Sequence, residues 1–530
     1  MFFRAWLDHA AIRSSPPGPL QTHHDVSSFY VHNTAHSIDI ALRRRTSYPA
    51  TFCKQIGSTS YQLGYGQSNA DGNAEFLNIV VARDGQLRIS RDVRATLPLF
   101  YGSVAGKFVI SNSYDEVTAA LPRLTLNPDS LEEILAPHVN YRPTLWQEIR
   151  VLDEREILSV DREGMVTVQY PSSRTWNISS DIPSSDPAHF VSQLENLLCQ
   201  TLSTYASRSN IGFELSGGLD SSLLPLYLSR YDKNQPWSSI TILVPGASEV
   251  TQRAKIAAIQ QYAPYGHLRT LKLKTHHYPL ANILGAPQAQ LFYPQRDIYL
   301  ELFDSMAETF KALNVDTVFT GLGGDEVFEH IVNSNEQLGT GQENIATRTG
   351  ALPSYCTNDF RHYIQMTTPK KQCRPIPILS TSVAGPCLAN NSYIERDIWP
   401  VALFKDHTFY TYCQGLPWTL KKNRQLLRAY YHASKFPDVI YDQTYPNEHF
   451  KDFFDDAFLS KFYTPFVEYF AQNSITAALG YIDNRNLLHT YQNMTSSPMT
   501  AKENDIFALF PWLCAEINLH TAHRTHKWTP

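Results

Sequence analysis

A glycine- and serine-rich segment that contains an aspartate, Ser-Gly-Gly-Leu-Asp-Ser-Ser at residues 216–222, carries the clearest chemical signal in this sequence. The apolar run at 211–215 predicts a buried strand before it, and the run at 223–228 predicts the opening of a helix after it. Two glycines allow a sharp turn that brings backbone N–H groups close to a ligand, and a helix start favours a phosphate group. Because an acidic side chain here repels phosphate unless a divalent cation lies between them, Asp220 predicts magnesium together with a nucleotide.

A second loop of the same kind lies about a hundred residues further along the chain. The run at 315–319 predicts another short buried strand, and Thr-Gly-Leu-Gly-Gly-Asp-Glu follows directly at 320–326. Two such strand-end loops are expected to converge at the carboxyl edge of a parallel sheet, where open α/β sheets bind their ligands. Either loop alone is compatible with an ordinary turn, but the two in this order predict a binding site.

Length and composition limit the remaining possibilities. The chain has 530 residues, and its 43% hydrophobic and 12% aromatic residues suffice for two or three domains with sizeable cores. The net charge of −5 is spread along the chain, which argues against bulk binding of nucleic acid. No apolar run approaches the ~20 residues of a membrane span. The seven cysteines are scattered without a Cys-x-x-Cys spacing, so we expect free thiols and a cytoplasmic location.

The order of predicted elements divides the chain into a β-rich first part and an α/β second part. An Asp-Gly turn at 84–85 between two apolar runs, the second with Leu87 and Ile89 alternating, predicts a hairpin over 76–91. The segments 97–101 and 107–111 predict another strand pair. The polar stretch 177–186 is typical of a linker. Asp186-Pro187 then predicts a capped helix with one apolar face, formed by Phe190, Leu194, Leu197, Leu198 and Leu202. Strand and helix patterns then alternate, with a strand at 240–244 and a helix near 249–262, which predicts a doubly wound parallel sheet.

The two loops resemble those of the ATP-pyrophosphatases, and the second loop resembles that of the asparagine synthetase branch. Enzymes of that family activate a carboxylate as an acyl-adenylate, release pyrophosphate and form an amide when an amine displaces AMP. The resemblance implies ATP and Mg²⁺ as cofactors, with Asp220 and Asp325 as the catalytic metal ligands. It further implies a set of ATP-binding residues along both loops and the neighbouring strand end: Leu215, Ser216, Gly217, Gly218, Asp220, Ser221, Ser222, Val244, Thr320, Gly321, Gly323 and Gly324.

The resemblance also implies a fold for each part of the chain. Residues 1–180 are similar to the Ntn-hydrolase-like glutamine amidotransferase domain of asparagine synthetases, and 186–530 are similar to the ATP-pyrophosphatase synthetase domain with a helical C-terminal extension. The amidotransferase domains use a cysteine directly after the initiator methionine, whereas this sequence has Phe2. A phenyl ring is no nucleophile, so we expect a degenerate domain that is structural or serves for docking.

The family's catalytic lysine has no obvious counterpart. The position nearest to it is Tyr445, and the first lysine that follows is Lys451, to which we assign the role in a shifted register. The run 421–430 resembles the basic helix of the synthetase domain, and its Lys421, Lys422 and Arg428 are alternatives. For each of these cations a solvated surface position is an equally good expectation.

The second loop also bears on the substrate. Leu322 stands where asparagine synthetases carry a glutamate and β-lactam synthetases a tyrosine, and an apolar side chain supplies neither a charge nor a hydrogen bond. The Gly-Gly-Asp form of the loop resembles the lasso-peptide cyclases. These activate an Asp or Glu side chain of a ribosomal precursor peptide, whose own N-terminal amine closes a macrolactam ring.

The resulting expectation is an ATP-dependent lasso-peptide cyclase that releases AMP and pyrophosphate. Its expected partners are the precursor peptide, a leader peptidase and a leader-binding protein, with no nucleic acid. One alternative is a β-lactam-synthetase-like or asparagine-synthetase-like amide ligase for a small metabolite. The other is a non-catalytic scaffold, which Phe2 and the missing lysine favour and the two aspartates oppose.

Overall fold

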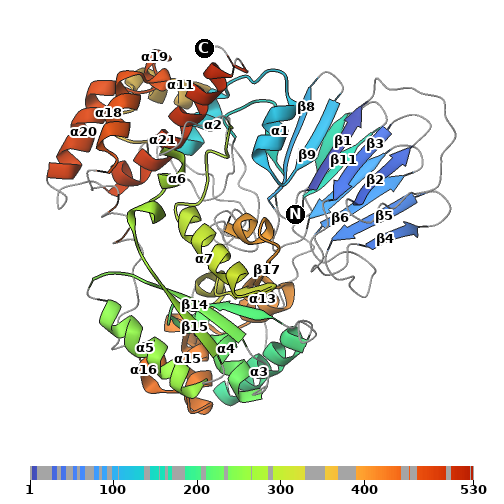
Figure 1. Ribbon diagram of the computed structural model, residues 1–530, viewed down its shortest axis with the longest axis vertical. Helices are drawn as coiled ribbons and strands as arrows, with labels where there is room; N and C mark the ends of the chain where they lie inside the picture. Colours follow the sequence, from blue (N-terminus) through green and yellow to red (C-terminus); the bar gives the residue numbers. More distant parts are fainter. Residues whose placement is uncertain are drawn as a thin grey trace.

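The computed structural model in Figure 1 shows a β-rich part, a parallel-sheet part and a helical part. The structure describes residues 3–8, 27–32, 37–42, 52–56, 60–65, 77–82, 86–91, 98–104, 107–135, 144–153, 156–161, 165–169, 186–203, 210–231, 237–246, 248–263, 266–284, 290–328, 352–367, 389–442, 453, 457, 462–496, 503–525 and 527–528. The description is of the backbone alone in the first five strands and at residues 77, 78, 81, 82, 104, 107, 203, 231, 325, 326, 367, 407, 410, 411, 414, 418 and 503–508. No helix within these ranges is long and apolar enough to cross a membrane.

The β-rich part contains two antiparallel six-stranded sheets. The first has the spatial order β10 (Ile149–Val151), β8 (Phe100–Val104), β9 (Lys107–Ser111), β1 (Phe3–Asp8), β3 (Ser37–Leu42) and β2 (Ser27–His32). The second has the order β12 (Val166–Gln169), β11 (Ile157–Val160), β7 (Leu87–Arg91), β6 (Leu77–Ala82), β5 (Ser60–Tyr65) and β4 (Phe52–Ile56). The predicted pairing of β6 with β7 is confirmed by the register Ile79↔Ile89. Along β7 the side chains of Leu87 and Ile89 are fully buried, which confirms the predicted alternation.

A helix joins the two halves of the chain as the sequence predicts. Helix α3 (Pro187–Ser203) begins after Asp186, whose Oδ1 accepts a hydrogen bond of 2.9 Å from Ala188 N. Proline at the first helical position fits because its missing N–H has no intrahelical partner there. The expected apolar face is buried throughout, and consists of Phe190, Leu194, Leu197, Leu198 and Leu202.

The predicted parallel sheet is present, and its strand order determines where a ligand can bind. Its five strands follow the order β15 (Gly266–Lys272), β14 (Trp237–Leu243), β13 (Ile211–Glu214), β16 (Thr317–Thr320) and β17 (Trp399–Ala402). The chain therefore runs outward from β13 to β15, then returns to the other side of β13. The crevice of an open α/β sheet forms at such a switch point, here at the carboxyl ends of β13 and β16.

Helices cover both faces of this sheet (Figure 1). They are α4 (Leu219–Tyr231), α5 (Glu249–Tyr262), α7 (Leu300–Ala312) and α15 (Gln425–Ala433). On one face Phe213 and Phe319 stack with 5.5 Å between ring centroids, in the same core as side chains of α3, α4 and α15. On the other face Ile240 and Val318 pack with Phe310 of α7. The side chains of the successive residues Val318 and Phe319 thus lie on opposite faces of the sheet, as the alternation of side chains along a strand requires.

The C-terminal helices return to the β-rich part. Helices α18 (Thr464–Gln472), α20 (Asn484–Ser496) and α21 (Glu503–Arg524) share one apolar core with α1 (Tyr114–Ala120) and α2 (Pro128–Leu135). Near the end of the chain, Lys527 Nζ donates to the carbonyl oxygens of Thr118, Ala119 and Leu121 at 3.0 to 3.2 Å. A cation at these carbonyl groups satisfies the end of α1.

Candidate functional site

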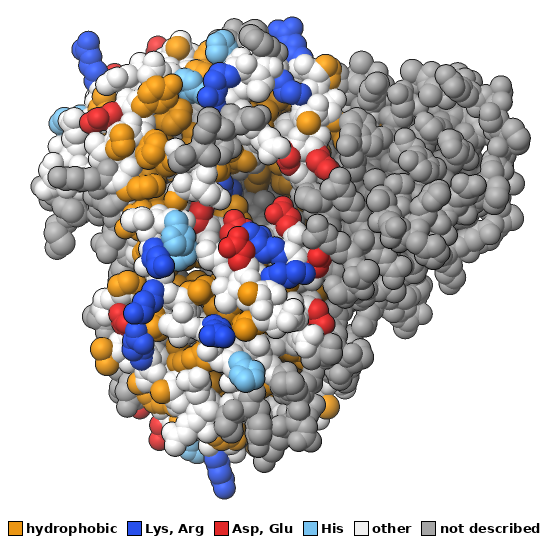
Figure 2. Space-filling view, viewed as in Figure 1, with side chains coloured by type: hydrophobic (Ala, Val, Ile, Leu, Met, Phe, Trp, Pro, Cys, Tyr) orange, Lys and Arg blue, Asp and Glu red, His pale blue; other side chains and the backbone are white. Residues whose placement is uncertain are grey.

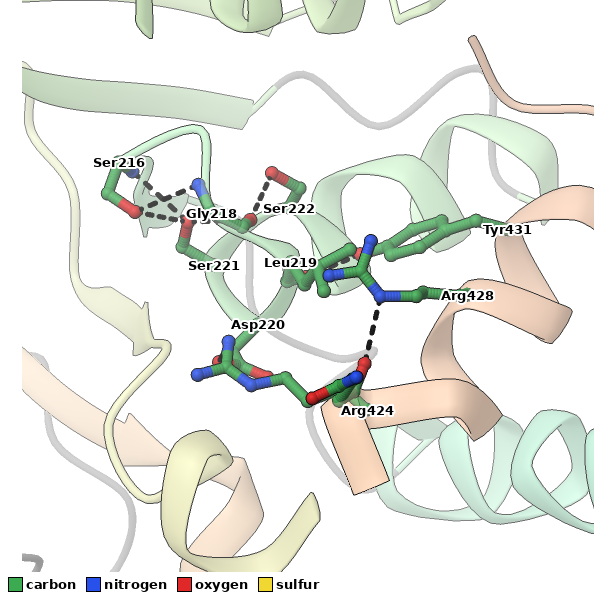
Figure 3. Close-up of polar contacts among 10 residues, drawn as sticks. Ser216, Gly218, Leu219, Asp220, Ser221, Ser222, Arg424, Arg428 and Tyr431 are labelled. Carbon is green, nitrogen blue, oxygen red and sulfur yellow. Dashed lines mark hydrogen bonds and ion pairs between the residues drawn. The ribbon is translucent and has the colours of Figure 1, made fainter. Parts of the chain in front are cut away.

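The loop after β13 is held in shape by its own serines (Figure 3). Gly217 has a φ of +88°, a value that side chains rarely adopt, so glycine is required at this turn. Ser216 and Ser221 lie 2.9 Å apart through their hydroxyl oxygens, and Gly218 N donates to Ser216 Oγ at 3.1 Å. The hydroxyl and the N–H of Ser222 both donate to Gly218 O, and the Ser221 hydroxyl donates to the same oxygen at 3.3 Å, so all three serines hold the loop.

Helix α4 begins earlier than predicted. The sequence pattern places its start at residue 223, but the helix starts at Leu219, so Asp220 lies in its first turn. An acidic side chain at this place faces the partial positive charge of the helix N-terminus, which stabilises the carboxylate. Asp220 is 8% exposed.

The second loop lies directly against the first. An ideal Cβ on Gly321 would lie 3.1 Å from Ser221 Cα, and one on Gly324 would lie 2.3 Å from Asp220 Cγ. The two loops therefore meet, as their positions at neighbouring strand ends predict. Asp325 follows Gly324 in the short helix α8 (Gly324–Phe328), so its backbone lies next to Asp220. Because its side chain is outside the description, its role as a metal ligand stays a prediction.

Three further predicted nucleotide residues lie at the same edge. Leu215 and Val244, at the ends of β13 and β14, are each 1% exposed. Thr320 ends β16 and is 2% exposed, and its Oγ1 has no hydrogen-bond partner among the described residues. A buried hydroxyl without a partner is costly, and an incoming ligand group would satisfy it.

A residue that the sequence did not reveal, Gln252, ties the two strand ends together. Its Nε2 donates to Ser216 O at 3.1 Å and to Ile242 O at 2.8 Å, and its Oε1 accepts from Val244 N at 3.2 Å. Helix α5, which carries Gln252, was predicted, but nothing in its sequence marks which polar side chain turns back to the sheet.

Replacement of Gln252 by leucine is expected to lower the free energy of unfolding by about 2–4 kcal/mol, because three buried backbone groups lose their partner at about 1–3 kcal/mol each with partial relaxation. Urea denaturation measures this change. The matched control is Gln260→Leu, an exposed glutamine of the same helix, for which the change should stay within about 0.5 kcal/mol. Equal effects of the two substitutions would contradict the assignment.

Arg424 contributes a guanidinium group to the site that the sequence analysis also missed. Its Nη1 lies 2.8 Å from Asp220 Oδ2, and the two side chains are 15% and 11% exposed. Arg424 stands just before α15 in the basic run that was predicted to supply a cation, but the run itself does not indicate which member reaches the loop. The sequence therefore indicated that this run supplies a cation, but not that the cation is Arg424.

The other candidate cations lie in different surroundings. Arg428 binds backbone groups: its Nε donates to Asn423 O at 2.8 Å, as Figure 3 shows, and its Nη1 donates to Tyr441 O. Lys422 is exposed, which fits a surface cation. Lys421 is 5% exposed, and burial lowers the pKa of its ammonium group. Lys451 lies outside the described residues.

Two buried lysines accompany these loops without having been predicted. Lys405 is 1% exposed, and its Cγ would lie 3.1 Å from a Cβ on Gly323. Lys255 is 2% exposed, and its Cβ would lie 3.4 Å from a Cβ on Gly217. Lys405 follows β17 and Lys255 follows β14, and these two strands flank the central pair β13 and β16. Basic residues therefore lie on both sides of the two loops, as a site for a polyanion requires.

Glu214, the last residue of β13, has an unusual titration. Burial raises its pKa from 4.5 to about 7, although a hydrogen bond donated by Tyr393 Oη opposes the rise. Between these two values the folded protein holds a proton that the unfolded chain has lost, so stability falls as the pH rises through this window.

Replacement of Glu214 by glutamine is therefore expected to remove the part of the stability loss between pH 4.5 and about 7 that this carboxyl group causes. Thermal unfolding measured at several pH values for the variant and the parent provides the test. An exposed glutamate, Glu308, whose side chain is 70% exposed, serves as the control position. A stability difference between Glu214→Gln and the parent that does not change with pH would contradict the assignment.

Comparison with known proteins agrees with this geometry. Residues 193–344 match the family model of asparagine synthase. The match supports an asparagine-synthetase-like family and spans both glycine loops together with β13 to β16. No curated protein matches the sequence. Among solved structures the chain is similar to the U34-tRNA thiolase NcsA from Methanococcus maripaludis with its [4Fe-4S] cluster. The identity is 14%, over 47% of this chain and 80% of that chain, and the TM-score of 0.20 is too low to support any argument.

The residues present fit the ATP and Mg²⁺ that an asparagine-synthetase-like site implies. Asp220 already pairs with a cationic group, since the Arg424 guanidinium lies on its Oδ2. The glycines of the second loop leave no room for side chains beside Asp220, and the Thr320 hydroxyl lacks a partner among the described residues. The described part of the chain contains no group of three or more His, Cys, Asp and Glu side chains that could hold a metal. Mg²⁺ needs no such group, because one or two carboxylates and the phosphates of its substrate suffice.

Proposed function

We propose that this protein is a lasso-peptide cyclase, within the ATP-dependent amide ligases that the asparagine synthase match indicates. The observation that carries the nucleotide site is the contact between the two loops, where Gly324 lies against the Asp220 carboxylate. Two glycine loops in contact at the switch point of a parallel sheet form a cradle for phosphate groups.

The reaction follows from the groups that this cradle would hold. An oxygen of the peptide's Asp or Glu carboxylate attacks the α-phosphorus of ATP, and the bond to pyrophosphate breaks. The N-terminal amine of the same peptide then attacks the acyl carbon, AMP leaves, and the amine nitrogen loses a proton. When bound, Mg²⁺ neutralises phosphate charge in both steps.

The chain's own residues would orient and stabilise the reactants. The first glycine loop and the N-terminus of α4 would bind the pyrophosphate, and Leu215 and Val244 would flank the adenine. The buried cations around the loops would stabilise the charge of the leaving pyrophosphate. The central physical task is to hold the amine and the acyl carbon within reach of each other.

A peptide substrate is favoured by two features. At position 322 the second loop carries leucine, which offers a small amino-acid substrate neither a charge nor a hydrogen bond. The face in Figure 2 is hollowed between the helical part and the parallel-sheet part, with charged side chains gathered at the hollow and hydrophobic ones above it. A surface that offers both kinds of contact suits a peptide. We further propose that residues 1–180 form an amidotransferase-like domain, and that a leader peptidase and a leader-binding protein act with this enzyme in the cytoplasm.

ATP–pyrophosphate exchange tests the proposed function. Precursor peptides with an Asp or Glu at the ring position are expected to stimulate exchange, and the matching Asn or Gln peptides are not. Exchange stimulated by small diacids and not by peptides would replace the proposal with the small-metabolite ligase. Absence of ATP binding in the presence of Mg²⁺ would leave only the non-catalytic scaffold.

A further inference from the structure

The ion pair between Arg424 and Asp220 links two distant parts of the sequence at the nucleotide loop. Arg424 Nη1 lies 2.8 Å from Asp220 Oδ2, and 204 residues separate the two in the sequence. With side chains only 15% and 11% exposed, the pair is largely shielded from water, so its attraction is weakly screened. Figure 3 shows the guanidinium lying on the carboxylate at the start of α4.

The backbone that presents Arg424 adopts a conformation that needs support. Asn423 has a φ of 52° and Arg424 a φ of 55°, so two consecutive residues other than glycine lie in the left-handed region. Arg428 Nε donates to Asn423 O at 2.8 Å, which pins this turn from the following helix. Tyr431 Oη donates to Leu219 O and ties the same helix to the first residue of α4. Strain of this kind persists only where the surroundings impose it, and here they place Arg424 on Asp220.

We infer that Arg424 is the internal counter-ion of Asp220 in the nucleotide-free protein and competes with the divalent cation for that carboxylate. This inference rests on the proposed function, and it adds an order to binding: the metal binds weakly alone and well together with the nucleotide. ATP brings phosphate oxygens that replace Asp220 as the partner of Arg424, and these form strong charge-assisted hydrogen bonds with a guanidinium. Arg424 is thus a positioning residue that couples the binding of metal to that of nucleotide.

The size of the coupling follows from the fraction of time that Arg424 occupies Asp220. If that fraction is about nine-tenths, the apparent affinity for the metal alone is reduced about tenfold, and removal of the guanidinium restores it. In the variant the nucleotide's ability to strengthen metal binding should shrink by about the same factor, because no guanidinium is left for the nucleotide to draw away from Asp220.

Binding of Mn²⁺ to the full-length protein, followed by the loss of the free-ion signal in electron paramagnetic resonance, tests this inference without measuring activity. The parent is expected to bind Mn²⁺ weakly alone and more tightly with α,β-methylene-ATP, after subtraction of the Mn²⁺ that the analogue binds without protein. Arg424→Gln is expected to bind Mn²⁺ alone about tenfold more tightly. Lys422→Gln removes the same charge from an exposed neighbour and is expected to match the parent. Asp220→Asn is expected to bind Mn²⁺ at this site neither with nor without nucleotide.

Two outcomes separate this inference from the proposed function. If the parent binds Mn²⁺ with the nucleotide analogue but Arg424→Gln binds Mn²⁺ alone no more tightly, the counter-ion role is wrong and the proposed function stands. If the parent binds Mn²⁺ neither alone nor with the nucleotide analogue, the proposed function is wrong, and the inference that rests on it is wrong as well. Arg424→Lys keeps the charge but loses the planar fork, so it should bind Mn²⁺ alone with an affinity between parent and Arg424→Gln. Should Arg424→Gln fail to fold, an unchanged affinity in Arg424→Lys would equally overturn the inference.

Discussion

Asparagine in place of Asp220 is expected to lower peptide-dependent ATP–pyrophosphate exchange by about 10³-fold or more. The carboxylate lies in the first turn of α4, against Gly324 of the second loop, where it would hold the cation on the phosphates. Loss of this charge removes electrostatic stabilisation on the order of 4 kcal/mol, which corresponds to that factor in rate. Asparagine has nearly the same size, so the packing against Gly324 is kept. Circular dichroism should therefore show an intact fold.

The matched control for this prediction is Asp186→Asn. Asp186 caps α3 with its Oδ1, and asparagine caps helices as well as aspartate does. Exchange and thermal stability should both stay near the parent values. Full exchange activity in Asp220→Asn would contradict the assignment of the metal site to this carboxylate.

Alanine at Gly324 is the second substitution with a large expected effect. The added Cβ would lie 2.3 Å from Asp220 Cγ and 2.7 Å from its Oδ1, so either the carboxylate or the start of α8 must shift. Overpacking of this kind costs about 1–3 kcal/mol, and we expect the Kd for the Mg²⁺ complex of an ATP analogue to rise about tenfold or more. Isothermal titration calorimetry measures that Kd.

Gly480→Ala provides a matched comparison for Gly324→Ala. Gly480 has a φ of +82°, and nothing lies within 4 Å of the position of its Cβ. Alanine there should lower stability by about 1 kcal/mol through backbone strain alone, with unchanged nucleotide affinity. Equal nucleotide affinities of the two variants would contradict the claim that the packing of Gly324 against Asp220 shapes the nucleotide site.

The features that follow local rules were predictable from the sequence. The hairpin at 76–91, the cap at Asp186 and the buried face of α3 each depend on residues a few positions apart, and each is confirmed. The parallel sheet and the contact of its two loops also followed, because glycines after apolar runs mark strand ends. The start of α4 was placed too late, since Leu219 and Asp220 carry no feature that separates a loop from a first helical turn.

The features that depend on distant parts of the chain were not predictable. Two consecutive left-handed residues other than glycine at 423–424 have no sequence signature, yet they decide that Arg424 rather than Arg428 reaches Asp220. Glutamine and lysine are residue types that usually lie at the surface. Here the parallel strands bring three of them to the loops, where they are buried: Gln252, Lys255 and Lys405. Glu214 was overlooked for the same reason, since its partner Tyr393 lies 179 residues away in the sequence.

The central claim is that Asp220 and Asp325 meet at one edge of the parallel sheet and hold a metal on the phosphates of ATP. A crystal structure of the protein with Mg²⁺ and α,β-methylene-ATP tests this claim most directly. The account predicts both carboxylates at about 2.1 Å from Mg²⁺ ions on the phosphates, with the loop of residues 216–222 around the pyrophosphate. A nucleotide bound elsewhere, or an Asp325 carboxylate turned away from every metal, would contradict it.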